Sequence, residues 1–135
     1  MASVQNHINQ WLHNRQFIQS ISPVYSDWMV TASFYAALHA VDALLLHDNV
    51  RGVTSHDSRN RILSLTNRYK KINSLYYPLY DLSRTIRYIA EPAKWVPYSS
   101  IEADVLKRFL YPIESSVKAL SGLSAEFSPI VLQKL

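Results

Sequence analysis

The stretch "WMVTASFYAALHAVDALLL", residues 28–46, decides the fold class of this chain. Its apolar residues recur at the spacing of an α-helix and form one wholly apolar stripe. A second stripe at the same spacing is half polar, because it contains His39 and Asp42. An acidic residue at the centre of a bilayer costs about 2.5–3.5 kcal/mol on insertion scales. The stretch therefore predicts a buried helix at the centre of a helical bundle rather than a membrane span.

The composition around this helix excludes several other classes of protein. A chain of 135 residues forms one domain and can bury a core. Only two residues are glycine, which argues against a hairpin-rich β fold. The absence of cysteine excludes a disulfide framework, thiolate zinc sites and a cysteine nucleophile. Since "MASVQNHINQW" has no signal-peptide pattern either, we expect a cytoplasmic protein.

Helical periodicity and its breaks predict an all-α, up-and-down bundle of about five helices. Ser55 or Asp57 can cap the third of them. We expect residues 1–122 to form the bundle and residues 123–135 to form a tail that packs on it or on a second subunit. The expected helices span residues 3–20, 27–47, 55–65, 73–90 and 99–120.

Several boundary residues give these helices their expected ends. Ser26 is the expected N-cap of the second helix, and Pro78 is expected near the first turn of the fourth. The fifth helix is predicted to open with a capping box between Ser99 and Glu102 and to kink near Pro112.

Basic residues concentrate in one window of the sequence, residues 51–87. It holds eight arginine and lysine residues and two aspartates, a net charge of +6. Four tyrosines lie within it, and Tyr88 directly follows it. Proteins that bind single-stranded nucleic acid combine such charges, which contact phosphates, with aromatic rings, which stack on bases. The alternative is a solvated helix face beside a tyrosine-rich core.

The segment "SHDSRNRIL", residues 55–63, contains the first candidate site. His56 and Arg59 lie one turn apart at a helix start, where free backbone N–H groups can bind an anion, and Asn60 follows them. A nearby arginine lowers the pKa of a histidine, so a neutral His56 could accept the proton of a ribose 2′-hydroxyl. We expect Arg59 and Asn60 to bind a ligand; the alternative is a capped helix start with exposed arginines.

Two further groups of residues are candidates for the same ligand. His39 and Asp42 lie within one turn, either as hydrogen-bonded core groups or, with Tyr35, as the wall of a pocket that faces the 55–63 segment. In the fourth helix, Arg84 can pair with Asp81 on the surface or turn inward to an anion. The remaining candidates of that helix are Arg87 and Tyr88.

We expect no metal site and no cofactor. His7 and His13 are too far apart on one helix to bind a metal without further ligands. The chain also contains no glycine-rich phosphate loop and no HExxH or Gly-x-Ser-x-Gly motif.

Three blocks in register, residues 28–46, 55–63 and "LYDLSRTIRY" at 79–88, resemble the HEPN-domain family, in particular its small stand-alone members. The resemblance implies an all-α up-and-down bundle that is commonly a homodimer. It also implies roles in RNA cleavage, nucleotide binding or toxin–antitoxin pairs.

The ribonucleases of that family carry an Arg-Asn-x-x-x-His motif, from which this chain departs. Its only match to the spacing is "RGVTSH", from Arg51 to His56, which lacks the asparagine. We therefore expect a domain that binds RNA or a nucleotide phosphate through residues 51–87. One alternative is a metal-independent ribonuclease with His56 as the base and Arg51 or Arg59 as a phosphate clamp. The other is a non-catalytic module that binds a protein partner, as in a toxin–antitoxin pair.

Overall fold

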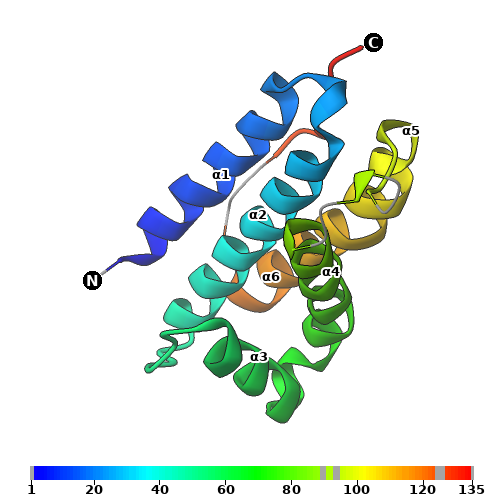
Figure 1. The fold of residues 1–135 in the computed structure, drawn as a ribbon. Coiled ribbons are helices and arrows are strands. Elements are labelled where there is room, and N and C mark those ends of the chain that lie inside the picture. Colours follow the sequence, from blue (N-terminus) through cyan, green and yellow to red (C-terminus); the bar gives the residue numbers. More distant parts are fainter. Residues whose placement is uncertain (1, 89–90, 93–94, 124–126, 135) are drawn as a thin grey trace.

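A computed structural model describes residues 2–88, 91–92, 95–123 and 127–134, and these residues form an all-helical bundle (Figure 1). No strand occurs in these ranges, so the predicted all-α fold is confirmed. The main helices are α1 (Val4–Ser20), α2 (Ser26–His47), α3 (His56–Leu65), α4 (Lys70–Tyr88), α5 (Tyr98–Ile101) and α6 (Tyr111–Ser121). Two short 3-10 turns, η1 (Pro23–Tyr25) and η2 (Asn67–Tyr69), and a π-helical segment, η4 (Glu102–Leu110), complete the fold.

Helix α2 is the central element, and the other long helices pack around it (Figure 1). Phe34, on the apolar stripe of α2, and Leu44, beside that stripe, are both fully buried. The helix is long and apolar enough to cross a membrane, but 83% of its most apolar window is buried inside the protein. It is therefore the core helix that the sequence predicts.

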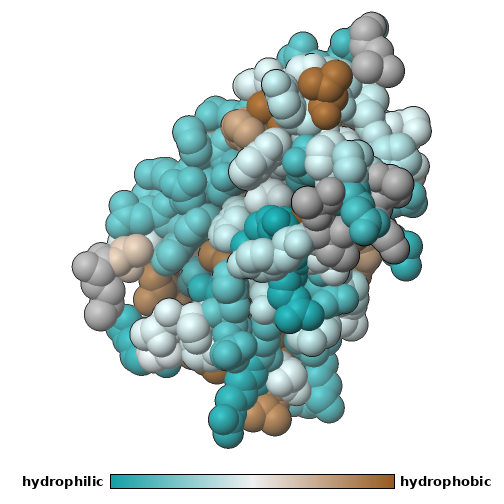
Figure 2. Space-filling view, in the orientation of Figure 1, coloured by the Kyte–Doolittle hydropathy of each residue, from teal (hydrophilic) through white to brown (hydrophobic). Residues whose placement is uncertain are grey.

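Helix α1 runs antiparallel to α2 (Figure 1), and a buried ion pair joins it to α6. Arg15 Nη1 donates to Glu114 Oε1 at 2.6 Å, and Trp11 Nε1 donates to the other carboxylate oxygen at 2.6 Å. The outer face of α1 is hydrophilic, and in the same view apolar side chains form only small patches (Figure 2). The helix is thus amphipathic, and its buried face contains a charge that requires a partner.

The described part of the C-terminal tail, residues 127–134, lies against α1 and α6 of the same chain. Ile130 is buried, and its N–H donates to the Tyr111 hydroxyl at 2.9 Å. The N–H of Val131 donates to Gln19 Oε1 at 3.0 Å. The guanidinium of Arg15 lies 4.8 Å from the centre of the Phe127 ring. These contacts join the tail to the same region that holds the buried ion pair.

The helix predicted over residues 99–120 starts earlier than expected, and its middle contains a π-helical segment. Elements α5, η4 and α6 follow one another without a break. The predicted Ser99–Glu102 capping box is wrong, because the first turn begins at Tyr98, after Pro97, and has no side-chain cap. A π-helical segment precedes Pro112, and the N–H of Tyr111 bonds to a carbonyl five residues earlier. The wider turn accommodates a proline that has no N–H to donate.

Two other predicted boundaries are also wrong, for local reasons. Helix α2 begins at Ser26 itself, because the Ser22 hydroxyl caps a 3-10 turn that leads into the helix. Helix α4 begins at Lys70, so Pro78 lies in its interior rather than in its first turn. Pro78 and Ser74 are both exposed, so water can reach the carbonyl that the proline leaves unpaired. Gly122 ends α6 as expected, with φ +70°.

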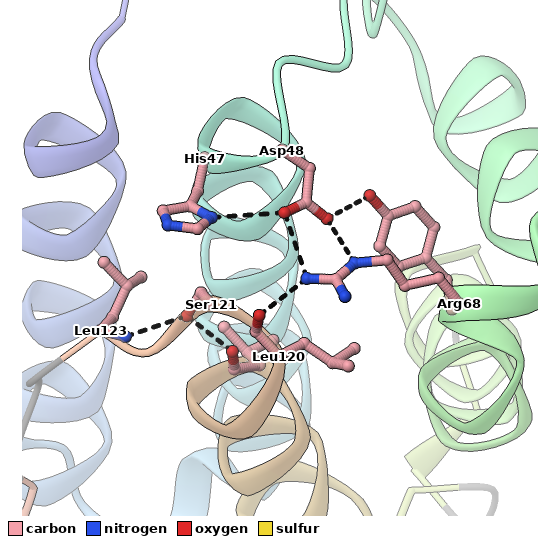
Figure 3. A network of polar contacts seen from close by, with 8 residues as sticks. His47, Asp48, Arg68, Leu120, Ser121 and Leu123 are labelled. Carbon is pink, nitrogen blue, oxygen red and sulfur yellow. Dashed lines mark hydrogen bonds and ion pairs between the residues drawn. The ribbon is translucent and has the colours of Figure 1, made fainter.

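Asp48 joins the end of α2 to two other parts of the bundle (Figure 3). It accepts hydrogen bonds from Arg68 Nε at 2.9 Å and from the Tyr69 hydroxyl. Arg68 Nη2 also donates to the carbonyl of Leu120, at the end of α6, at 2.7 Å. Burial and the Asp48 carboxylate raise the pKa of Tyr69 to about 12, so the phenol remains a donor. Arg68, one of the basic residues of the 51–87 window, therefore has a structural role.

Replacement of Glu114 by alanine is expected to destabilise the protein strongly, because it leaves Arg15 buried without its partner. Breaking a buried pair in this way costs about 3–5 kcal/mol. Urea denaturation would measure the loss. The control is Glu102→Ala, which removes an exposed pair with Lys107 and should cost less than about 1 kcal/mol. Equal losses in the two variants would contradict a structural role for the buried pair.

Candidate functional site

The start of α3 is fixed by a reciprocal cap. The Ser55 hydroxyl accepts the N–H of Ser58 at 3.1 Å, and the Ser58 hydroxyl accepts the N–H of Ser55 at 3.0 Å. This cap makes His56 the first residue of the helix. His56 and Arg59, one turn apart, consequently face α2 and α4 rather than solvent.

Arg59 forms a buried, bidentate ion pair with Asp42 of α2. Its Nε and Nη2 donate to the two carboxylate oxygens at 2.7 and 2.9 Å. Only 7% of Arg59 is exposed, and its third nitrogen, Nη1, is buried with no hydrogen-bond partner among the described residues. This geometry is the strongest form of arginine–carboxylate contact. It fastens α3 to the central helix and gives the charge of Asp42 a partner inside the bundle.

His56 lies between two aromatic rings, with ring centres 5.8 Å from Phe34 and 5.5 Å from Tyr80. Its Nδ1 is buried and has no partner in the described part of the chain. Burial lowers the pKa of His56, and the charges of Arg59 and Arg87 lower it further. The imidazole is therefore neutral at pH 7. The sequence predicts the effect of the arginine, but burial is the larger cause.

The three candidates at the end of α4 separate into an inner and an outer group. Arg87 turns inward, donates to the Tyr35 hydroxyl at 2.9 Å and lies 5.7 Å from the centre of the Phe34 ring. Arg84 pairs with Asp81 at 3.2 Å on the surface, and Tyr88 is 78% exposed. Tyr35, Arg87 and His56 thus belong to one cluster. Arg84 and Tyr88 lie at its exposed edge, where the Arg87 guanidinium is 5.7 Å from the centre of the Tyr88 ring.

His39 has a partner that the sequence reasoning did not identify. Its Nδ1 lies 3.0 Å from Nδ1 of His7 on α1, while the oxygens of Asp42 are bonded to Arg59. Burial and the neighbouring His7 lower the pKa of His39. One signal could have revealed His7: it lies four residues before Trp11, on the buried stripe of α1.

Arg51 and His56, the proposed catalytic pair, lie in different surroundings. Arg51 lines a cavity of about 410 Å³ between the start of α1, the end of α2 and the following loop. His7 and Asp42 line the same cavity, and His56 does not. The other lining residues are Ala2, Leu45, Leu46, Val50, Gly52, Val53 and Thr54. Arg51 therefore shares its cavity with His7, whereas the sequence suggested His56.

An open groove of about 620 Å³ runs between α3 and α4. Arg61 lies on its α3 side, and Tyr77, which is 50% exposed, lies on its α4 side. Asn60 also lines it, and its amide oxygen is buried with no partner in the described residues. The remaining lining residues are Ser64, Leu65 and Asn73. The groove brings a cation, two amides and an aromatic ring together on one face.

Comparison of the chain with protein-family models, with curated proteins and with solved structures found no match. The functional argument therefore depends on the chemistry and geometry of the chain's own residues.

Protonation of His56 is expected to make stability depend on pH. The unfolded chain binds a proton near the ordinary histidine pKa of about 6.5, and the folded chain binds it only at a lower pH. The free energy of unfolding should thus decrease as pH falls below about 6.5, by at most about 1.4 kcal/mol per pH unit for each proton. Urea denaturation between pH 7 and 5 would measure it.

The matched variants for this measurement are His56→Gln and His13→Gln. His56→Gln should flatten the pH profile, and His39, whose pKa is also lowered, should leave part of the slope in place. His13 is exposed on α1, and its replacement should leave the profile unchanged. An unaltered slope in His56→Gln would contradict the assignment.

Proposed function

We propose that this protein binds a phosphate-containing ligand, a nucleotide or a segment of single-stranded RNA, in the groove between α3 and α4. The observation that carries the proposal is that Arg61, Asn60 and Tyr77 line one open groove. The groove is shallow and open to solvent, so an extended strand could reach it.

The distribution of charge supports Arg61 as the phosphate ligand. Of the eight basic residues in the 51–87 window, Arg59, Arg68 and Arg84 are paired with aspartates, and Arg87 is bonded to a tyrosine. The other four are exposed and form no ion pair within the described ranges; they are Arg51, Arg61, Lys70 and Lys71. Exposed cations of this kind are free to neutralise phosphates.

Helical geometry places a second cation, Lys70, beside the groove rather than in its lining. Lys70 precedes Asn73 by three residues and Tyr77 by seven, so it shares their face of α4. Arg61 on α3 and Lys70 on α4 can thus contact successive phosphates. This pair of cations would position a backbone along the groove.

Tyr77 and the two asparagines supply contacts for a base. Stacking of a base on an aromatic side chain contributes about 1–3 kcal/mol. The amides of Asn60 and Asn73, on opposite sides of the groove, can form hydrogen bonds with the edge of a base. The groove therefore has chemistry for both halves of a nucleotide.

In this proposal Arg59 positions the groove and does not bind the ligand. It is bonded to Asp42. Two steps along a helix rotate the side-chain direction by about 200° around the axis, so Arg61 lies on nearly the opposite face. Anchoring Arg59 inward consequently turns Arg61 outward. Catalysis by His56 and Arg51, membership of the HEPN family, a toxin–antitoxin partner and a cytoplasmic location remain predictions from the sequence.

Arg61→Ala is expected to weaken binding of labelled single-stranded RNA by about 1.5–3 kcal/mol, the contribution of a hydrogen bond to a charged group. Titrations at two salt concentrations should also give a log–log slope that is less steep by about 0.7, the value for one lost phosphate contact. The control is Arg108→Ala, which removes an exposed arginine of η4. Salt-insensitive binding, or equal losses in both variants, would contradict the proposal.

Tyr77→Ala tests the stacking contact separately, with an expected loss of about 1–3 kcal/mol. Tyr25→Ala is a close control, because Tyr25 is 52% exposed and Tyr77 is 50% exposed. A parallel titration with a mononucleotide distinguishes the two sources of the ligand. Saturable binding of the mononucleotide indicates a nucleotide site, and binding of the oligonucleotide alone indicates RNA.

We also propose that the protein is a homodimer, because apolar side chains are exposed at the corner between α1 and α2. Phe17 is 40% exposed, Trp28 is 54% exposed, and both line one groove of about 320 Å³. Exposed apolar patches commonly mark interaction surfaces.

Sedimentation should show a dimer at micromolar concentration and a monomer for Trp28→Glu. The control Leu65→Glu, at a residue that is 72% exposed on α3, should remain dimeric, and a monomeric wild type would exclude the dimer.

A further inference from the structure

Three side chains with metal-binding chemistry converge where α1 packs on α2. His39 and Asp42 lie one turn apart on α2, and His7 reaches them from α1. One ligand atom from each of the three lies within 4.8 Å of the others. We propose that His7, His39 and Asp42 bind a divalent transition-metal ion. This site uses other helices than the α3–α4 groove and does not depend on the proposed phosphate binding.

The spacing of the two imidazoles fits adjacent coordination positions. Nδ1 of His7 and Nδ1 of His39 are 3.0 Å apart. Ligand nitrogens about 2.0–2.1 Å from a metal lie about 2.9 Å apart when they subtend a right angle at it. Two histidines and one carboxylate on one side of an ion form the facial arrangement that leaves other positions open.

Asp42 can serve both Arg59 and a metal. Each of its carboxylate oxygens accepts one hydrogen bond from Arg59, at 2.7 and 2.9 Å. A carboxylate offers about four lone-pair sites, so two remain for an ion. Arg59 would then hold the Asp42 carboxylate in position for the metal, as outer-shell partners do in metal sites.

The charges around the site determine which ions it favours. The positive charge of Arg59 offsets the negative charge of Asp42, so little net attraction remains for a hard cation such as Mg²⁺ or Ca²⁺. The imidazoles of His7 and His39 dominate instead, and imidazole favours Zn²⁺, Co²⁺ and Ni²⁺. The site should therefore select transition metals.

The open coordination positions of such an ion would face the cavity of about 410 Å³. His7 and Asp42 line this cavity, and Arg51 and Thr54 lie on its wall. The cavity can hold water or a small anion, and Arg51 supplies a positive charge for a phosphate or carboxylate group. The chemical class of ligand that fits there is thus a small anion that contacts both the metal and Arg51.

The test uses the full chain without a histidine tag, freed of metal and titrated with Co²⁺ and Zn²⁺. Calorimetry and the visible absorption of Co²⁺ should give one ion per chain, and Mg²⁺ should not bind. Loss of an outer-shell group lowers metal affinity about 10–100-fold, so loss of a ligand in His7→Ala or His39→Ala should lower it by more than about 100-fold. The matched control is His13→Ala, an exposed histidine of the same helix as His7.

Thermal denaturation gives a second readout and tests the folding of each variant. A metal that binds only the folded chain should raise the melting temperature of the wild type and of His13→Ala, but not that of His7→Ala. Absence of binding to the wild type, or an equal loss of affinity in His13→Ala, would overturn the site. Arg61→Ala should bind metal as the wild type does, so failure of the groove proposal and failure of this one are distinguishable.

Discussion

Burial of the Asp42 carboxylate in the bundle is the constraint from which much of the architecture follows. An ionised carboxylate cannot leave water without a partner, because the desolvation cost far exceeds what packing can offset. Its side chain is only 12% exposed, on a helix surrounded by others, so the partner must come from another element. Arg59 meets this requirement. Its bidentate ion pair with Asp42 fixes both the distance and the rotation of α3 relative to α2. The orientation of His56 and Arg61 follows from that rotation.

The same physical rule divides the basic residues of the 51–87 window into two kinds. Arg59 and Arg68 each meet an aspartate of α2 or its end, and they hold the bundle together. Arg61 and Lys70 have no such partner in the described ranges and face water. A net charge of +6 in this window therefore overstates the surface charge available to a ligand. What remains is a smaller set of cations beside Tyr77.

Helical periodicity is sufficient to predict which segments are helices, because burial of one face imposes it on the sequence. The ends are less predictable, since they depend on local competition. Ser99 and Glu102 have the spacing of a capping box, but the helix already begins at Tyr98, with Pro97 at its N-cap position. Pro78 lies inside α4 because a 3-10 turn leads into the helix at Lys70.

The candidate site is predictable only as far as single helices determine it. The polar stripe of α2 brings His39 and Asp42 to attention, but the two contact residues of other helices rather than each other. The identity of those partners depends on how α1 and α3 rotate against α2, which no local pattern specifies. The buried stripe of α1 marks His7 as an inward-facing residue, but it does not identify His39 as its partner. Arg59 was predicted to contact a ligand, but its long side chain can reach either solvent or Asp42.

Asp42 connects α1, α2 and α3, and this limits what a substitution there can reveal. Replacement by asparagine would remove a charge that Arg59 requires and a ligand atom near His7 at once, so loss of fold and loss of a site could not be separated. His7 and Arg61 have no such double role: His7 is only partly buried, and Arg61 is exposed. A change in binding at either position therefore reports on the site more directly than a change at Asp42 does.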